Sequence, residues 1–138
     1  AFLKQRVAGD IIFNPKESVA LEGNSGPYIQ YAHARARSIL SKATSGEVEL
    51  LDLQPLERTL VRKISEYPEA IEKSMIDLMP HHICTYLYEL AQTFNRFYEH
   101  SRVIGDPREA ERLQLITLYA DVLQDGLGLL GIAAPEKI

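Results

Sequence analysis

Three side chains that could bind a metal ion or serve nucleophilic catalysis lie close together, at His81, His82 and Cys84. Imidazole and thiolate groups are good zinc ligands and can also carry covalent chemistry. Adjacent residues on a helix point about 100° apart, so at most two of the three could share one ion. No second Cys/His pair completes a tetrahedral site, and no partner acid or oxyanion loop accompanies the cluster. The sequence therefore predicts no metal site and no catalytic residue, and Cys84 is expected to be a small buried hydrophobic residue.

The composition is that of one ordinary globular domain. The chain has 138 residues, with 46% hydrophobic and 25% charged content, which suits a single domain with a core. No run approaches the roughly 18 apolar residues of a membrane span, and the N-terminus has none of the regions of a signal peptide. A single cysteine forms no internal disulfide, which agrees with a reducing compartment. We therefore expect a cytoplasmic protein with no membrane partner.

The formal net charge of −4 argues against an open basic surface that holds nucleic acid by charge alone. The basic residues are unevenly spread, however, because His33, Arg35, Arg37 and Lys42 come close together. A nucleic-acid site is compatible with this sequence if such residues gather on one face of the fold.

Apolar residues recur at three- and four-residue spacing in five stretches, which indicates amphipathic helices. Prolines, glycines and a turn-like break at 44–47 separate the stretches, and the sequence has no clear strand pattern and no internal repeat. Long helices joined by short loops predict an all-α bundle of about five helices with antiparallel neighbours. The predicted helices run from Tyr28 to about Ala43, from Pro55 to just before Pro68, from Glu69 to Met79, from about Pro80 to His100, and from beyond Asp106 to about Leu130.

Local signals mark the ends of several of these helices. Asn24 or Ser25 can cap the first helix, and Pro27 suits its first turn. Asp106 is expected to cap the last helix, and Gly131 is expected to end it.

The spacing also predicts which side chains face the core. The fourth stretch has the strongest apolar stripe, so its helix is expected to be central. The side chains expected to face inward are Tyr28, Tyr31, Ala32, Ala36, Ile39 and Leu40 in the first helix, Ile71, Met75, Leu78 and Met79 in the third, and Ile83, Leu87, Leu90, Phe94 and Phe97 in the fourth. His33, Arg37 and Lys42 fall outside the inward stripe of the first helix.

The opening residues 1–22 show no sustained helical period. Asp10–Phe13 is expected to be a short extended piece, and Asn14-Pro15 a turn that ends it. The chain is therefore expected to consist of a short irregular connecting segment, 1–22, and a helical domain, 23–138.

Several stretches resemble one known family. FNPKES at Phe13–Ser18 leads into EGNSGPYIQYAHAR at Glu22–Arg35, and CTYLYEL at Cys84–Leu90 leads into FNRFYE at Phe94–Glu99. GLGLLGI from Gly126, followed by PEKI at the end, is similar to the last residues of the same family. Over essentially its whole length, the chain resembles the C-terminal, DALR-type anticodon-binding domain of arginyl-tRNA synthetases, which are class I enzymes.

This resemblance implies a domain that holds the anticodon loop of an arginine tRNA, with the middle cytosine as the main base read. A separate Rossmann-type domain activates arginine with ATP in this family, and residues 1–22 resemble the connection to it. Nothing here resembles the His-Ile-Gly-His or Lys-Met-Ser-Lys motifs, so this chain alone is expected to be inactive and to hold no cofactor. ATP and Mg²⁺ are expected only in the complete enzyme. The expected partners are arginine tRNA and the catalytic domain, with no DNA, and the protein is expected to be a monomer.

The family grips the anticodon with aromatic and basic side chains, and the matching residues are Tyr28, Arg35, Tyr98 and Ile138. Unstacked bases are recognised by stacking on aromatic rings or guanidinium planes and by hydrogen bonds to their edges. Tyr28 and Arg35 are two helical turns apart, so they project from one face and could form one pocket. Ile138 stands where the family commonly has a methionine, which is more adaptable against a base.

Three further residues are candidates for RNA contact. Asn24 lies in the loop before the first helix, whose glycines would let the backbone approach the anticodon. Tyr31 and His33 follow on the first helix. Each candidate also has a structural interpretation: the loop as an ordinary capped turn, Tyr31 as a core residue, His33 as a residue facing backbone or solvent.

Among the family-matched residues, Tyr28 could be a ring packed at the helix start, Arg35 a solvated charge and Tyr98 a core residue beside Phe94 and Phe97.

A second function class stays open, namely a free-standing helical module derived from this domain that binds or regulates another protein. Net acidity and the changed last residue are its support. An exposed apolar patch of several hundred Å² without a basic stripe would favour it.

Overall fold

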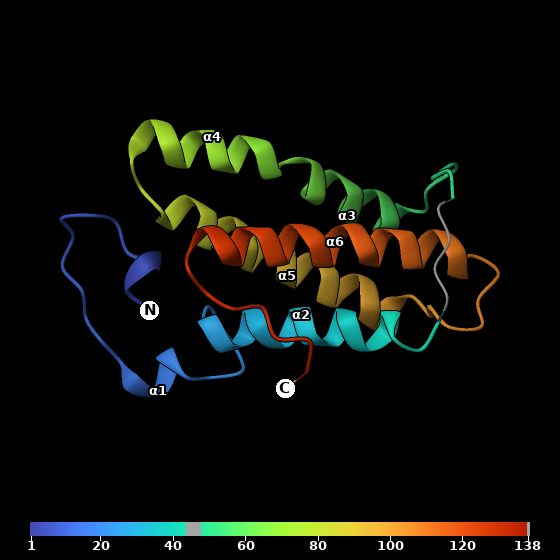
Figure 1. Ribbon diagram of the computed structural model, residues 1–138, viewed down its shortest axis with the longest axis horizontal. Coiled ribbons are helices and arrows are strands. Elements are labelled where there is room, and N and C mark those ends of the chain that lie inside the picture. Colours follow the sequence, from blue (N-terminus) through green and yellow to red (C-terminus); the bar gives the residue numbers. More distant parts are fainter. Residues whose placement is uncertain (44–47, 138) are drawn as a thin grey trace.

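The computed structural model describes residues 1–43 and 48–137 of the chain. Every regular element in these residues is helical (Figure 1), and none of these helices is long and apolar enough to cross a membrane. The turn predicted at 44–47 lies outside the described residues. The elements are a 3-10 helix η1 (Phe2–Lys4) and the α-helices α1 (Pro15–Ser18), α2 (Gly26–Leu40), α3 (Pro55–Ser65), α4 (Tyr67–Asp77), α5 (His81–His100) and α6 (Glu109–Leu129).

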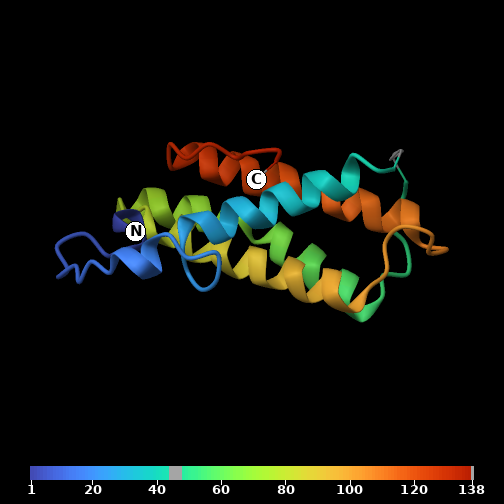
Figure 2. The ribbon, with the colours of Figure 1, turned by 90° about the horizontal axis from the view of Figure 1, so that it is seen from below.

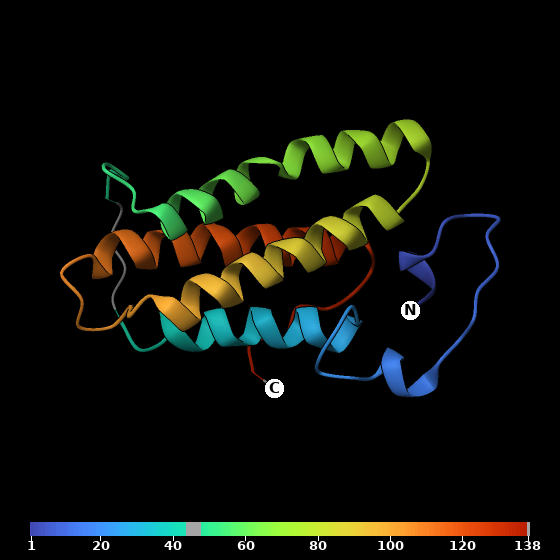
Figure 3. The same cartoon turned by 180° about the vertical axis from the view of Figure 1, so that it is seen from behind.

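Helix α5 lies at the centre of the bundle, as its apolar stripe predicts. It packs against α2, α3, α4 and α6, and α6 packs in turn against α2 and α3. Figures 1 and 3 show α2 on one side of the α5–α6 pair and α3 with α4 on the other. The predicted all-α bundle of five helices is confirmed, with α2 to α6 as the five.

Helices α3 and α4 run in the same direction, so the expected antiparallel reversal does not occur between them (Figure 1). Only Glu66 separates the two helices, and α4 begins at Tyr67 rather than at the predicted Glu69. Pro68 occupies the first turn of α4, where its missing N–H breaks no intrahelical hydrogen bond. The proline therefore bends one long helical path and does not reverse it.

Helices α5 and α6 meet at an aromatic stack and at a buried glycine. The rings of Phe94 and Tyr119 are stacked with their centroids 4.1 Å apart, and both are fully buried. Gly126 lets the two helices approach, because a Cβ atom added there would lie 2.6 Å from Leu87 Cδ2. This close approach brings α5 and the end of α6 together beside α2.

Two inward faces differ from those predicted from spacing. On α2, Tyr31 is 39% exposed and His33 is fully buried, the reverse of the expectation. In α4 and directly after its last residue, Met75 and Leu78 are 69% and 83% exposed, although both were expected to face inward. Helix α4 lies at the edge of the bundle, where it packs mainly against α5 and reaches α6 through the hydrogen bond that the Tyr67 hydroxyl donates to Asp125, so much of its surface is uncovered.

A buried carboxylate fixes the connection between α5 and α6. Glu57 is 1% exposed and accepts hydrogen bonds from Arg108 at 2.7 and 3.0 Å and from Arg112 at 2.9 Å. It also accepts from the backbone N–H of Gln54 at 2.9 Å, which caps α3. Asp106 does not cap α6 as predicted: Arg108 holds that position, and its backbone N–H donates a hydrogen bond to a carboxylate oxygen of Asp106 at 2.9 Å.

Candidate nucleic-acid interface

Helix α2 begins at a capped loop that orients its side chains. Ser25 immediately precedes the helix, and its hydroxyl oxygen accepts a hydrogen bond from the Tyr28 N–H at 3.2 Å. Pro27 lies in the first turn, as predicted. Ser25 is therefore the cap, out of the two residues predicted as alternatives. The helix ends at Leu40, short of the predicted end near Ala43.

Arg35 on α2 lies over two tyrosine rings. Its guanidinium carbon is 4.9 Å from the centroid of Tyr31, which precedes it by one helical turn, and 5.6 Å from the centroid of Tyr98 on α5. A cation over an aromatic face is stabilised by about 0.5–1 kcal/mol at exposed sites. Both rings remain partly open to solvent, at 39% and 41% exposed. This group of side chains therefore offers flat aromatic and guanidinium surfaces to a ligand.

Asn95 on α5 joins Arg35 to Tyr28. Its side-chain oxygen accepts a hydrogen bond from Arg35 Nη1 at 3.0 Å, and its Nδ2 donates to the Tyr28 hydroxyl oxygen at 2.8 Å. The Tyr28 ring is half-buried and packs against Tyr88, with centroids 5.5 Å apart. Burial raises the pKa of Tyr28, so its phenol stays neutral. Sequence reasoning missed Asn95, although it belongs to the FNRFYE stretch and lies one turn before Tyr98.

A cleft of about 520 Å³ lies between α2, α5 and the residues that follow α6. We call residues 132–137 the C-terminal tail. Three predicted RNA contacts, Tyr31, Arg35 and Tyr98, line this cleft, and three of the four clustered basic residues do so as well. The lining residues are Tyr31, Ala34, Arg35, Arg37, Ser38, Ile39, Ser41, Lys42, Tyr98, Glu136 and Lys137.

The other predicted contacts lie elsewhere. Tyr28 supports the cleft through Asn95 without lining it. Asn24 is exposed in the loop before α2, and its backbone oxygen accepts a hydrogen bond from Lys4. His33 is fully buried and contacts the C-terminal tail. Ile138 lies outside the described residues.

The histidine and cysteine cluster at the start of α5 is used for packing. The rings of His81 and His82 have centroids 4.1 Å apart, and His82 Nε2 lies 2.7 Å from an Asp77 carboxylate oxygen. Cys84 is buried, as predicted, and burial raises the pKa of its thiol. Within residues 1–43 and 48–137, no three His, Cys, Asp or Glu side chains are grouped closely enough to hold a metal ion.

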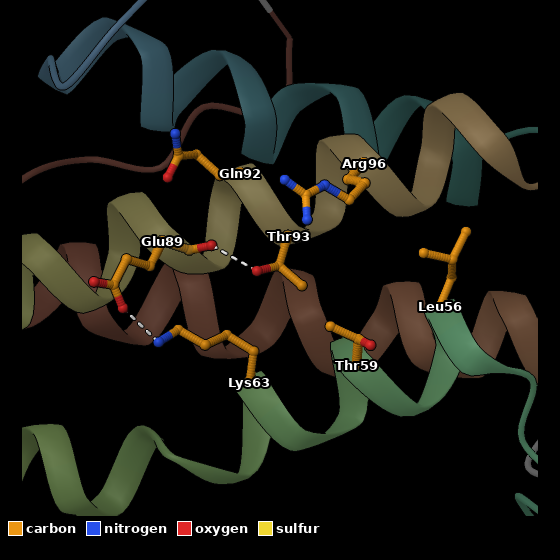
Figure 4. A pocket seen from close by; sticks show the side chains of 7 residues that line it. All are labelled: Leu56, Thr59, Lys63, Glu89, Gln92, Thr93 and Arg96. Atoms are coloured by element: carbon orange, nitrogen blue, oxygen red, sulfur yellow. Dashed lines mark hydrogen bonds and ion pairs between the residues drawn. The ribbon is translucent and has the colours of Figure 1, made fainter.

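A second cleft, of about 310 Å³, lies between α3 and α5 (Figure 4). Lys63 crosses it and pairs with Glu89 at 2.5 Å and with Glu66 at 2.8 Å. Figure 4 shows Gln92 and Arg96 along the α5 side. The lysine charge is already neutralised by two carboxylates, and this cleft contains no exposed aromatic ring. It is therefore less suited to nucleobases than the cleft beside Arg35.

The structure defines a small all-helical domain with a basic, tyrosine-lined cleft. A family model described as the DALR anticodon binding domain matches residues 29–138. The chain belongs to this family. The matched range contains every residue that lines the cleft.

Its relatives extend the comparison. The chain is 44% identical over 134 residues to an arginine–tRNA ligase of Frankia casuarinae and 38% identical over 147 residues to one of Synechocystis, covering 94% and 100% of the chain. The arginyl-tRNA synthetase of Thermus thermophilus has a similar structure, with a TM-score of 0.91 at 35% identity over 98% of the chain. The chain spans only about a quarter of the length of these relatives, 23% to 25%.

Proposed function

We propose that this domain binds the anticodon loop of an arginine tRNA in the cleft formed by α2, α5 and the C-terminal tail. The observation that carries the proposal is the position of Arg35 over the rings of Tyr31 and Tyr98. Asn95 holds one guanidinium N–H group, and among the described residues Arg35 has no carboxylate partner. The remaining donors are therefore available to a ligand.

The chemistry of this group fits an unstacked base. Stacking on an aromatic side chain contributes about 1–3 kcal/mol per base. A guanidinium group only donates hydrogen bonds, so it prefers a base edge rich in acceptors. Cytosine presents adjacent acceptors at O2 and N3, which two parallel N–H groups of Arg35 can reach together. We therefore assign Arg35 to the middle anticodon base and the rings of Tyr31 and Tyr98 to stacking.

Charge plays a supporting part in this proposal. Arg37, Lys42 and Lys137 line the same cleft and supply positive charge for the phosphates of the loop, while Glu136 pairs with Arg37 at 2.8 Å. The positive charge is local, because the whole chain carries a net charge of −4. We expect a modest dependence of affinity on salt, since only a few phosphates are neutralised.

The rest of the ligase is the second partner in this proposal. Large apolar side chains are exposed on the C-terminal end of α4 and on the segment around η1 and α1, which lie at the same end of the bundle (Figures 1 and 3). Ile12 is 93% exposed, and Phe13, Met75, Ile76 and Leu78 are also exposed. We assign this end to contact with the part of the ligase that this chain lacks, which would carry the ATP-dependent and Mg²⁺-dependent chemistry.

The same apolar residues are the specific observation in favour of the alternative, a module that binds another protein. These apolar residues lie away from the tyrosine-lined cleft. The protein-binding alternative predicts a surface without a basic stripe, but basic residues are gathered in that cleft. RNA binding is therefore the better supported function.

The test is binding of an arginine tRNA transcript, compared with the same transcript carrying a changed middle anticodon base. The wild-type chain should prefer the native anticodon by about 1–3 kcal/mol, the scale of one well-read base. Arg35→Gln should remove this preference. Arg96→Gln is the matched control, because it removes an exposed arginine of α5 from the other cleft and should keep the preference. Equal binding of both transcripts to the wild-type chain would exclude base recognition and favour the protein-binding alternative.

A further inference from the structure

The chain reverses sharply at the end of α6. Gly131 has a φ of +70°, a left-handed conformation that glycine adopts without strain. The N–H of Ile132 donates to Leu127 O at 2.9 Å, and the N–H of Gly131 donates to Gly128 O at 2.9 Å. These two bonds form a Schellman motif, which confirms the predicted end of the helix. The tail then crosses α2, as Figures 1 and 2 show together.

Three side chains of α2 hold the tail at successive points. Gln30 Nε2 donates to Ala133 O at 2.8 Å, and His33 Nδ1 lies 2.8 Å from Pro135 O. Arg37 Nη2 pairs with a carboxylate oxygen of Glu136 at 2.8 Å. Residues 30, 33 and 37 are three and four positions apart, so they share one face of the helix. All three contact residues that are 99 to 103 positions away along the chain.

His33 is at the centre of this set. A carbonyl oxygen only accepts hydrogen bonds, so the ring nitrogen Nδ1 must carry the proton that reaches Pro135. The other ring nitrogen, Nε2, is buried and has no hydrogen-bond partner among the described residues. A buried polar ring with a single partner is held in one orientation by that partner. The one hydrogen bond of this ring goes to the tail.

We propose that Gln30, His33 and Arg37 form a latch that fixes the C-terminal tail as one wall of the RNA cleft, with His33 as a positioning residue that does not touch RNA. The proposal rests on the function proposed above. Its basis is that the tail residues Glu136 and Lys137 line the cleft together with Arg35. Helix α2 thus carries the base-reading residues on one face and the latch on the adjacent face.

Two substitutions separate the latch from simple loss of packing. In His33→Asn the side-chain amide sits at the level of Nδ1 and can still donate to Pro135, whereas in His33→Gln it sits one bond further out, at the level of Nε2. Backbone ¹⁵N heteronuclear NOE values for Ala133, Ala134, Glu136 and Lys137 report tail order without RNA, since Pro135 has no N–H. We expect ordered tail amides in the wild-type chain and in His33→Asn, and mobile ones in His33→Gln.

Binding of the arginine tRNA transcript is measured on the same variants and on a chain that ends at Ile132. His33→Gln, which loses the hydrogen bond to the tail, should bind the transcript about tenfold more weakly than the wild-type chain. His33→Asn should keep most of the wild-type affinity. The shortened chain should bind as weakly as His33→Gln. Adding His33→Gln to the shortened chain should have no further effect, since latch and tail act as one unit.

Each failure has its own signature. A tail as rigid in His33→Gln as in the wild-type chain would overturn the latch. A mobile tail with unchanged RNA binding would show that the tail is not a wall of the site. The same conclusion would follow if His33→Gln weakened RNA binding equally in the full and in the shortened chain. A wild-type chain that binds no arginine tRNA would instead overturn the proposed function, together with the RNA role of the latch, while the NOE values would still report whether His33 holds the tail.

Discussion

Arg35 Nη1 donates a hydrogen bond to the side-chain oxygen of Asn95 at 3.0 Å, and this contact sets the orientation of the guanidinium group above the rings of Tyr31 and Tyr98. The oxygen of the Asn95 amide faces Arg35 because its nitrogen donates to the Tyr28 hydroxyl. Tyr28 therefore influences the orientation of Arg35 indirectly, through Asn95, without lining the cleft itself.

The first prediction concerns this relay. Tyr28→Phe removes the acceptor of the Asn95 amide and keeps the ring against Tyr88, so it should weaken binding of an arginine tRNA transcript about threefold to tenfold, the scale of one hydrogen bond. Arg35→Gln should cost more, because it also removes the donors that reach the base. Affinities measured by titration with both variants give the order. A larger loss in Tyr28→Phe than in Arg35→Gln would mean that the Tyr28 hydroxyl contacts RNA directly.

The second prediction concerns acid stability. Burial would raise the pKa of Glu57, but hydrogen bonds from Arg108, the Gln54 backbone and Arg112 outweigh it and lower this pKa from 4.5 to about 2. A depressed carboxylate pKa stabilises the fold at pH values above the unfolded pKa, and this stabilisation is lost as the pH falls toward 2. The contribution is about 3 kcal/mol at neutral pH. Urea unfolding at pH 6 and pH 3 should show this loss in the wild-type chain.

Glu57→Gln should lower the free energy of unfolding at pH 6 by a similar amount and flatten its decline between pH 6 and pH 3. Glu69→Gln is the control, because Glu69 is exposed and has no ion-pair partner among the described residues. An equally steep decline in Glu57→Gln and in the wild-type chain would assign the acid sensitivity to other carboxylates.

The third prediction compares two glycines of α6. Gly126→Ala places a methyl group 2.6 Å from Leu87 Cδ2, in a fully buried site, and should lower the free energy of unfolding by about 1–3 kcal/mol. Gly128→Ala meets nothing within 4 Å and should raise it by up to about 1 kcal/mol, because alanine favours a helix. Thermal unfolding of both variants tests the pair. Similar changes in both would mean that α5 and α6 separate easily.

Much of this protein could be predicted from local sequence. Apolar spacing, together with the prolines and glycines, predicted the five helices, a cap at Asn24 or Ser25 and the end of α6 at Gly131, because these features depend on residues within one or two turns. The resemblance of the chain to arginyl-tRNA synthetases also came from contiguous stretches, and the family match at 29–138 confirms it.

The faces of the helices and the members of the cleft were decided only by tertiary structure. His33 is buried because a tail about one hundred residues away lies over it, and Met75 and Leu78 are exposed because α4 lies at the edge of the bundle. Likewise, Arg35 meets Asn95 only because α2 packs against α5. Helical periodicity specifies which side chains share a face, whereas the partner of each face depends on packing between segments that are distant in sequence.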